Sequence, residues 1–315
     1  MKKTLFFGST CVDVVVYVDE MPHSGEDCNV LSQKMQIGGC AFNASEMSRH
    51  LSVPYTLLSP VGGGVFGDFI RGEFTKREIP CFVNLDSLEN GCCYNIVERN
   101  GERTFLAVHG AEYLFDSSWM EGVSVDDYDT AYVCGLELEE DTGKNMVDWI
   151  ENNFKGNIYF AVSSRIMHVK KDLLRRMLLL KPILHMNDME AKMLSGCATP
   201  QDAARWLYAR TENTVIITCN SEGCYIYGKE IAHETGAGDE PVGLMMDAYK
   251  TIAIDTVGAG DAHIGALIAF RKQGLSWIEA IDKANRIACE VVGVEGATLT
   301  DDQFRNIQLK QKGML

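Results

Sequence analysis

The sequence predicts an α/β fold: a doubly wound, mostly parallel sheet flanked by helices, with a small β-sheet lid. Two observations lead to this prediction. Short apolar runs, typical of buried strands, alternate along most of the chain with stretches of helical spacing. Residues 14–37 and 91–109 instead alternate apolar and polar residues, carry turn signals and contain no helix. We interpret them as hairpins that form a flap over a cleft. The alternative is an edge extension of the main sheet.

The expected elements follow one another in a regular order. The strands are predicted at residues 4–7, 55–61, 130–134, 158–162, 182–186 and 215–218, and the helices at 68–77, 142–152, 171–180, 189–194 and 202–208. Strands that alternate with helices form parallel sheets covered on both faces, so this order justifies the double winding. No internal repeat, low-complexity tract or long linker interrupts it. We therefore expect a single domain over residues 1–315, with the lid segments inserted in it.

Composition limits the partners that the protein can have. The chain has 29 basic and 44 acidic residues and a net charge of −15, so we expect it to bind neither nucleic acid nor a membrane surface. No apolar run reaches the ~18 residues of a membrane helix. Asp13 interrupts the apolar N-terminal run, which fits a first strand better than a signal peptide. The eleven cysteines form no CxxC pair, so we expect a cytoplasmic protein with reduced thiols.

The strongest chemical signal lies in residues 251–270. A strand runs into the glycine-flanked turn Gly258-Ala259-Gly260, and a helix follows with Asp261 in its first turn. Glycines let backbone N–H groups approach a ligand, and the helix N-terminus adds unpaired donors and partial positive charge. The turn therefore predicts a cradle for a phosphoryl group. A carboxylate there is useful if it takes the proton from an attacking hydroxyl, which makes Asp261 the candidate base. The alternative is a first-turn acid favoured only by the helix dipole.

The same four letters recur at residues 236–239. Glu240 and Pro241 follow them and no amphipathic helix begins at once, so we interpret this second copy as a loop.

Four motifs resemble the ribokinase (PfkB) family of carbohydrate kinases. Residues 255–261 (DTVGAGD) resemble its C-terminal signature and residues 38–44 (GGCAFNA) its N-terminal element. Residues 61–68 resemble its VG-x-D-x-x-G stretch, and residues 187–190 (NDME) its N-x-x-E motif. The motifs fall in the family's order across nearly the whole chain. The resemblance implies a ribokinase-like fold and ATP-dependent phosphorylation of a hydroxymethyl group on a sugar or sugar-like molecule.

The resemblance also implies roles for individual residues, with ATP, Mg²⁺ and K⁺ as cofactors. Asp261 would be the general base, and Gly258, Ala259 and Gly260 the anion hole. The remaining assignments are acceptor binding by Asp13, Gly39, Asn43 and Glu137, nucleotide binding by Asn187, Thr218, Gly223 and Asn285, Mg²⁺ through water at Glu190, and a monovalent cation at Asp255 with backbone carbonyls near residues 292–296. Lid strands that pair between subunits would give a homodimer.

The residues themselves leave alternatives open. Asn187 and Glu190, three apart at a helix start, suit a water-keeping Mg²⁺ but equally form a capping pair. On local grounds Asp255 is as well explained as a turn residue. Arg103 and His109, on the second lid stretch, suit a substrate anion, although isolated basic residues on a strand are more commonly solvated.

Departures from the family pattern weaken ribose as the acceptor. Cys40 stands where ribokinases carry lysine and Cys11 where they carry asparagine, and both changes remove polar groups that would hold a ribose. Phe42 suits a nucleoside or another ring, so a nucleoside kinase of the same fold is the alternative, although core packing is the commoner place for a phenylalanine. His263 replaces a usual aromatic residue, and we interpret it as a helix-face residue without a catalytic role. Asn220 replaces a glycine expected in the nucleotide loop.

Two other classes of protein are compatible with parts of the sequence. Residues Gly62–Gly67 satisfy G-x-G-x-x-G between a strand and a helix, and Asp86 stands nineteen residues after Gly67, so an NAD(P)-binding oxidoreductase is a remote alternative. The other class is a non-catalytic binding protein on the kinase fold, although a pure binder has no need of a base at Asp261. Pentose, hexose, sugar acid and nucleoside acceptors all fit the sequence.

Overall fold

The main sheet has the predicted doubly wound, mostly parallel architecture. The structure, a computed structural model, describes residues 1–311. Its eight-stranded sheet has the order β14-β13-β12-β11-β10-β9-β1-β4. Neighbours from β4 to β12 are parallel, and β13 and β14 are antiparallel. The bounds are β1 Lys3–Phe7, β4 Tyr55–Leu58, β9 Tyr128–Cys134, β10 Asn157–Ala161, β11 Ile183–Asn187, β12 Val215–Thr218, β13 Cys224–Gly228 and β14 Val242–Met246. The predicted fold class is confirmed.

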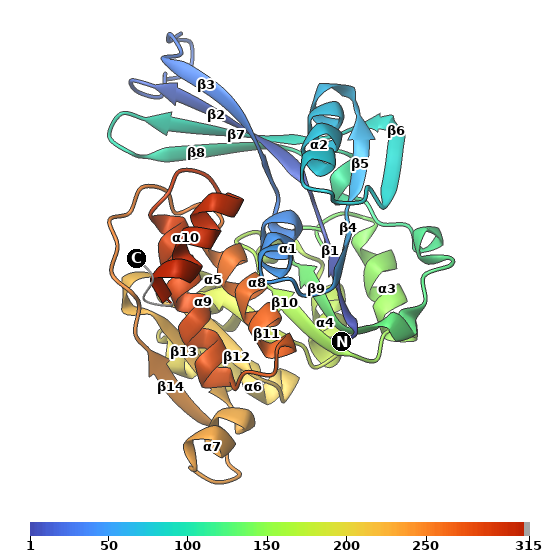
Figure 1. The fold of residues 1–315 in the computed structure, drawn as a ribbon, viewed down its shortest axis with the longest axis vertical. Coiled ribbons are helices and arrows are strands. Elements are labelled where there is room, and N and C mark those ends of the chain that lie inside the picture. The colour runs from blue at the N-terminus through green and yellow to red at the C-terminus, as the bar shows by residue number, and fades with distance from the viewer. Residues whose placement is uncertain (312–315) are drawn as a thin grey trace.

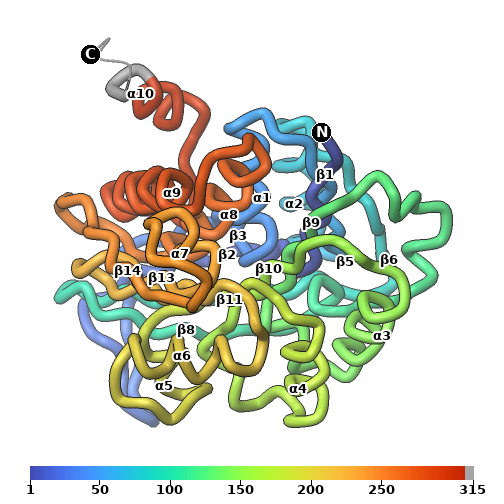
Figure 2. The backbone as a smooth tube through the Cα atoms, turned by 90° about the horizontal axis from the view of Figure 1, so that it is seen from below, coloured from blue at the N-terminus to red at the C-terminus, as the bar shows by residue number. Residues whose placement is uncertain are grey.

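Helices cover both faces of this sheet, as Figure 2 shows. Successive strand residues point to opposite faces, so Phe6 joins one core while Leu5 and Phe7 join the other. One face carries α1 Cys40–His50, α7 Lys229–Thr235, α8 Ala259–Lys272 and α9 Trp277–Val292, and the other carries α3 Gly143–Asn153, α4 Lys171–Leu179, α5 Asp188–Ser195 and α6 Pro200–Thr211.

The two segments predicted to form hairpins build a second, four-stranded sheet with the order β3-β2-β7-β8. Its strands are β2 Cys11–Val18, β3 Ser32–Gly38, β7 Cys92–Glu98 and β8 Arg103–Val108. Each hairpin is antiparallel, and the parallel pairing of β2 with β7 joins the two hairpins. This sheet projects beyond one end of the main sheet (Figure 1). The alternative of an edge extension is wrong, because none of the four strands pairs with the main sheet.

A third, two-stranded sheet contains the glycine-rich stretch that suggested a dinucleotide site. The predicted strand 55–61 is divided, since β4 joins the main sheet while β5 Pro60–Gly63 pairs with β6 Val83–Glu89. Helix α2 Gly64–Lys76 lies so close to β5 that a Cβ on Gly67 would be 1.8 Å from the carbonyl oxygen of Gly62. Asp86 forms an ion pair with Arg71 at 3.3 Å. Close helix packing thus explains these glycines without a dinucleotide.

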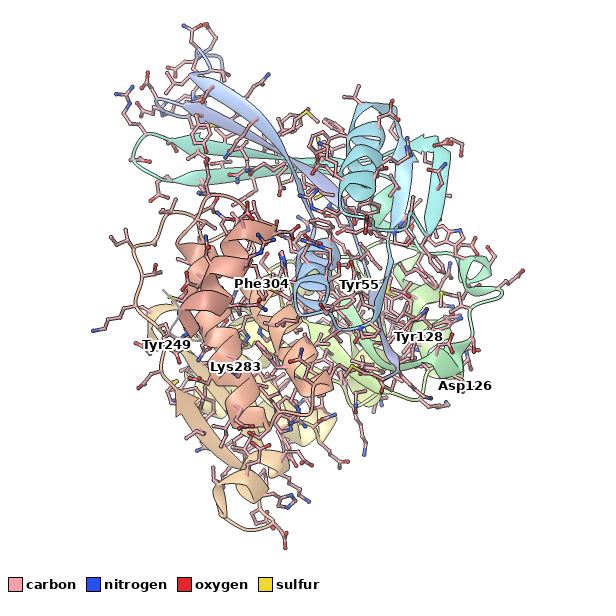
Figure 3. The ribbon with its side chains drawn as sticks, in the orientation of Figure 1. Tyr55, Asp126, Tyr128, Tyr249, Lys283 and Phe304 are labelled. Atoms are coloured by element: carbon pink, nitrogen blue, oxygen red, sulfur yellow. The ribbon has the colours of Figure 1, made fainter. Side chains whose placement is uncertain are left out.

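The C-terminal helix α10 Asp301–Gln311 packs against the end of α1. The Phe304 ring, labelled in Figure 3, stacks on His50 with ring centroids 4.5 Å apart. Arg49 pairs with Asp301 at 2.7 Å. The last four residues of the predicted domain span, 312–315, lie outside the described part of the chain. Within residues 1–311, no helix has the length and apolar character needed to cross a membrane.

The sequence did not predict several elements near the C-terminus, among them β13, β14, α7 and α9. The second Gly-Ala-Gly-Asp copy is a loop, as expected: α7 ends there, with Gly236 at φ 71° in the left-handed conformation of a helix C-cap.

Candidate active site

Helices α1 and α8 bring the two central polar side chains together. The Asn43 side chain, in α1, donates a hydrogen bond from Nδ2 to Oδ2 of Asp261, in α8, at 2.9 Å. Their close packing depends on Gly265, where a Cβ would lie 2.2 Å from the carbonyl oxygen of Ala44. Sequence reasoning missed this role, although a glycine inside a helix, four residues after the candidate base, was a usable signal.

The turn before Asp261 requires glycine and opens outward. Gly258 has φ 76°, and a Cβ there would lie 2.2 Å from the carbonyl oxygen of Ala297. A Cβ on Gly260 would meet nothing within 4 Å. The first N–H groups of a helix precede its own hydrogen-bond ladder. The Ala259 N–H donates weakly to the Thr256 carbonyl oxygen at 3.4 Å, while the N–H groups of Gly258 and Gly260 have no partner in the described structure. Open space beside free donors is the condition for binding an anion.

The Asp261 carboxyl is suited to exchange a proton near neutral pH. Burial raises its pKa to about 6, against the opposing effect of hydrogen bonds from Asn43 and the Cys40 thiol. The carboxyl is therefore mostly ionised at pH 7 and still basic enough to take up a proton. A pKa near the operating pH is what a general base requires.

Asp13 lies on β2, close to Asp261. Burial, together with the negative charges of Asp261 and Asp255, raises its pKa to about 7. Its side chain lies against the backbone of the neighbouring strand β3, where a Cβ on Gly38 would be 2.2 Å from Oδ2. Strand β2 thus brings a second carboxyl group close to Asp261.

Glu137, just after β9, is 1% exposed and only partly satisfied. Its Oε1 accepts the backbone N–H of Ser9 at 2.7 Å, while Oε2 has no partner in the described structure. Burial raises the pKa of Glu137 to about 7. Gly39 lies beside the same loop, since its Cβ would be 2.5 Å from the Ser9 carbonyl oxygen. The Oδ1 atom of Asn43 is also buried without a partner in the described structure. Glu137 Oε2 and Asn43 Oδ1 are therefore two acceptors that hydrogen-bond donors of a ligand could pair with.

The predicted nucleotide residues gather around the segment that follows β14. Thr218 ends β12 and Gly223 closes the next turn, with φ 108° and a Cβ position 2.0 Å from the Met246 carbonyl oxygen. Asn285, on α9, donates to the carbonyl oxygen of Asp247 at 3.2 Å. Tyr249, labelled in Figure 3, donates to Asp282 of the same helix at 2.9 Å. Gly223 and Asn285 therefore meet at this segment, and Thr218 stands at the base of the turn.

A buried histidine pair supports this side of the site. His263 contacts His185 of β11 at 2.8 Å and Asn285 at 3.0 Å through its two ring nitrogens. Burial lowers the pKa of His263 to about 4 and that of His185 well below its ordinary value, so both rings are neutral. The sequence indicated a helix-face residue without a catalytic role at His263 and gave no sign of its partner, because β11 is distant along the chain.

Asn187 and Glu190 form a reciprocal capping box at the start of α5. The Glu190 N–H donates to Asn187 Oδ1 at 2.8 Å, and the Asn187 N–H donates to Glu190 Oε2 at 2.9 Å. The alternative interpretation of Asn187 and Glu190 as a capping pair is therefore confirmed. The box leaves out Glu190 Oε1, and burial raises the pKa of Glu190 to about 7. The described residues hold no group of three or more metal-ligating side chains, so any cation there would depend on water or substrate for ligands.

Asp255 and the two basic lid residues are all paired. Arg103 Nη1 lies 2.8 Å from Asp255 Oδ1. His109 Nδ1 lies 2.6 Å from Glu140, and the His109 ring stacks on Tyr113. The expectation that Arg103 and His109 are solvated residues on a strand is therefore wrong.

Comparisons with known proteins agree on one family. The family described as pfkB family carbohydrate kinase matches residues 1–303. An Escherichia coli protein described as an uncharacterized sugar kinase is 25% identical over 94% of this chain and 90% of its own. The ribokinase structure from Thermotoga maritima has a TM-score of 0.82 at 17% identity, covering 98% of this chain and 99% of its own. A Burkholderia thailandensis nucleoside kinase in complex with inosine has a TM-score of 0.77 at 18% identity, covering 98% and 97%.

Proposed function

The chain belongs to the pfkB family of carbohydrate kinases and is thus an ATP-dependent sugar kinase, and we propose that it phosphorylates a hydroxymethyl group with Asp261 as the base. The predicted family and ribokinase-like fold are confirmed. The observation that carries the proposal is the Asn43–Asp261 hydrogen bond at 2.9 Å, placed directly after the open glycine turn. It puts a proton acceptor next to backbone donors, as phosphoryl transfer requires.

The proposed reaction follows from these positions. Asn43 holds Oδ2 of Asp261, which leaves Oδ1 to take the proton of the acceptor hydroxyl. The hydroxyl oxygen then bonds to the γ-phosphorus of ATP while the bond to the β-phosphate oxygen breaks, and ADP leaves. Backbone N–H groups of Gly258, Ala259 and Gly260 stabilise the charge on the phosphoryl group in transit. The lid excludes water and so favours transfer over hydrolysis of ATP.

The acceptor side favours a neutral polyhydroxylated molecule. Asp13, Glu137 and the free Oδ1 of Asn43 are all hydrogen-bond acceptors, so they match hydroxyl donors. A second anion would add repulsion among carboxyl groups whose pKa values are already raised. We therefore favour free sugars over sugar acids and sugar phosphates.

A nucleoside acceptor is the second candidate. Phe42 gives it no support, because this ring is buried and stacked on Phe74. Phe105 does support a nucleoside acceptor. Residues two apart on a strand share a face. Phe105 lies on the same lid face as Arg103 and is 53% exposed, so it offers a surface to a ring. The similar nucleoside kinase was solved with inosine.

The nucleotide side fits ATP with Mg²⁺. The uncapped Oε1 of Glu190 and the nearby Asn187 suit a hard cation that keeps its waters, and the ion would neutralise charge on the triphosphate. Thr218, Gly223 and Asn285 would line the nucleotide around the segment after β14. The cation assigned to Asp255 is a different case, because Arg103 already pairs with that carboxylate.

The lid and the cysteines support two further parts of the proposal. Met35, Val14, Tyr94 and Leu106 are in register across the four lid strands, and three of them are exposed. An apolar row of this kind suits a second copy of the lid, giving a homodimer. All eleven cysteines are free thiols, which suits a reducing compartment such as the cytoplasm.

The test is acceptor-dependent release of ADP from ATP·Mg²⁺ across free sugars, sugar acids, sugar phosphates and nucleosides. We expect a free sugar to give the strongest signal, and Asp261→Ala to lower turnover by roughly 10²–10⁴-fold. Near-normal turnover in that variant would refute the role of Asp261. Acceptor-dependent ADP release only with nucleosides would select the second candidate.

A further inference from the structure

We propose that the guanidinium of Arg103, supplied by the lid, takes the place of a monovalent cation at Asp255, so that this kinase does not depend on K⁺. The inference rests on the proposed function, because it assigns a role beside the anion-hole turn. It departs from what the family resemblance implied for Asp255, and the disagreement comes from the contacts of that carboxylate.

Asp255, the carboxylate expected to hold a cation, already has partners on both oxygens, and so does one of the carbonyl groups of the nearby loop. Asp255 Oδ1 accepts the N–H of Val257 at 2.9 Å and faces Arg103, while Oδ2 accepts the N–H of Gly296 at 3.1 Å. The Val292 carbonyl oxygen, in the loop expected to complete the site, accepts the N–H groups of Ile254 and Asp255 at 2.9 and 3.2 Å. With Arg103 in this position, Asp255 therefore does not fit a K⁺ ion as well, because the guanidinium already lies against its Oδ1 atom.

The lid position that places Arg103 is fixed by further contacts to the same loop. Arg103 on β8 lies in register with Val97 and, through it, with Tyr17 on β2, so their side chains share one face. The Tyr17 hydroxyl bonds to Glu295, and Lys34 of β3 pairs with the same carboxylate. Strands β2, β3 and β8 thus all contact the segments around Asp255 and Glu295.

The Arg103–Asp255 pair is shielded from water, so solvent screens the attraction between the two charges only weakly. The two side chains are 20% and 8% exposed. Arg103 Nη1 has no acceptor at hydrogen-bonding angles in the described structure, so the interaction is an ion pair and depends mainly on charge. A guanidinium stays protonated at any physiological pH and, unlike K⁺, cannot dissociate into solution. It therefore supplies the positive charge permanently while the lid is in place.

This charge acts next to the catalytic turn. Asp255 holds the N–H of Val257, which directly precedes Gly258. Neutralising Asp255 keeps its carboxylate in position and so orders the start of the turn. A lifted lid would leave a poorly hydrated carboxylate without its partner, which is costly. Arg103 is in this sense a positioning residue that links the lid to the anion hole.

The primary test is thermal melting of the protein without nucleotide, in KCl, NaCl and N-methylglucamine chloride at equal ionic strength. We expect the wild-type Tm to be the same in all three salts. Arg103→Ala should lower it by about 5 °C or more in N-methylglucamine, because it leaves a shielded charge unpaired. K⁺ should restore part of that loss, and Asp255→Asn combined with Arg103→Ala should abolish the restoration.

Arg99→Ala is the matched control. Arg99 comes from the same hairpin but is 73% exposed and pairs with Asp19 at the surface, so we expect wild-type melting and no response to K⁺. Arg103→Lys keeps the charge and should stay independent of K⁺. If the alanine variant does not fold, Arg103→Met retains the stem's packing and serves in its place.

Turnover gives the second readout. Wild-type ADP release should change less than twofold between the salts, whereas Arg103→Ala should fall at least tenfold and respond to K⁺. A wild-type enzyme activated severalfold by K⁺, a K⁺-specific rise in wild-type Tm, or an Arg103→Ala variant indistinguishable from Arg99→Ala would overturn the proposal. The melting experiment needs no acceptor, so a failure of the kinase assay leaves this test standing.

Discussion

The acceptor side and the nucleotide side of the site are built in opposite ways. On the acceptor side, Glu137 Oε2 and Asn43 Oδ1 are buried without partners among the described residues, and the pKa values of Asp13 and Glu137 are both raised to about 7, chiefly by burial. On the nucleotide side, Asn285 bonds to His263 and to the Asp247 carbonyl oxygen, and Asn187 and Glu190 cap one another.

This difference indicates what each side requires from its ligand. A buried polar atom without a hydrogen-bond partner costs free energy until a ligand supplies a donor. Binding of a polyol should therefore recover more free energy on the acceptor side than ligand binding does on the nucleotide side. On the nucleotide side most polar side chains have partners within the protein, and Glu190 Oε1 is the atom that the capping box leaves for a cation. Substitutions on the two sides should therefore change stability in opposite directions, and their effects on stability and kinetics should differ in size.

The largest expected effect is on stability, from Glu137→Gln. The folded-state pKa of Glu137 is about 7, above the ~4.3 of an unfolded glutamate. The folded state thus binds this proton more tightly, and its stabilising contribution is lost as pH rises through about 7. The neutral variant should be more stable than the wild type by roughly 3–4 kcal/mol at pH 8 and nearly equal at pH 4, below the unfolded-state pKa. Urea unfolding at both pH values measures this, and equal stability at pH 8 would contradict the picture of an unpaired carboxylate.

Next in size is Gly265→Ala, which forces α8 away from the Ala44 carbonyl oxygen. The shift should displace the Asp261 carboxyl itself from the acceptor hydroxyl and lower kcat about 10²-fold, as misplacement of a reacting group by about 1 Å does. Gly72→Ala is the control, since a Cβ on this α2 glycine meets nothing within 4 Å. If both variants keep wild-type kcat, close helix packing does not position the base.

A smaller effect, on the KM values for the two substrates, distinguishes the acceptor side from the nucleotide side. Asn43→Ala should raise KM for the acceptor about tenfold with little change in KM for ATP, because it removes a hydrogen bond to the ligand. Asn285→Ala should act mainly on stability and on KM for ATP, since its partners are His263 and the Asp247 carbonyl oxygen. Steady-state kinetics with each substrate varied in turn measures both, and an unchanged acceptor KM in Asn43→Ala would remove this residue from the acceptor side.

The smallest expected effect is a displaced pH profile. Ionised Asp261 is the active form, so kcat/KM should fall about tenfold per pH unit below about 6. The hydrogen bond from Asn43 lowers the pKa of Asp261, so Asn43→Ala should move this acid limb to higher pH by less than one unit. Profiles for both proteins between pH 5 and 9 measure it, and a limb that moves to lower pH would be inconsistent with Asp261 as the titrating base.

Local patterns in the sequence were enough for most of the alternation of strands and helices, the two hairpins and the glycine turn before Asp261. The prediction of a strand that runs into that turn is wrong, because residues 251–255 form neither helix nor strand and Ile252 and Ile254 are exposed. The predicted strand at residues 4–7 corresponds to β1 Lys3–Phe7, and that at 215–218 to β12 Val215–Thr218. Such features succeed because side-chain periodicity and glycine conformation depend on near neighbours in the chain. The pattern gave no warning that residues 55–61 divide between two sheets.

Distant contacts were decided by the tertiary structure alone. The ion pair of Arg103 with Asp255, the contact of His185 with His263 and the hydrogen bond of Asn43 to Asp261 each join residues from separate elements. Residue types and spacing predicted a candidate base, a glycine turn and two hairpins. The packing of helices and sheets decides which charge pairs with Asp255, which residue contacts His263 and which atom of Glu137 stays unpaired. Burial and pairing energies belong to that packing and cannot be read from spacing along the chain.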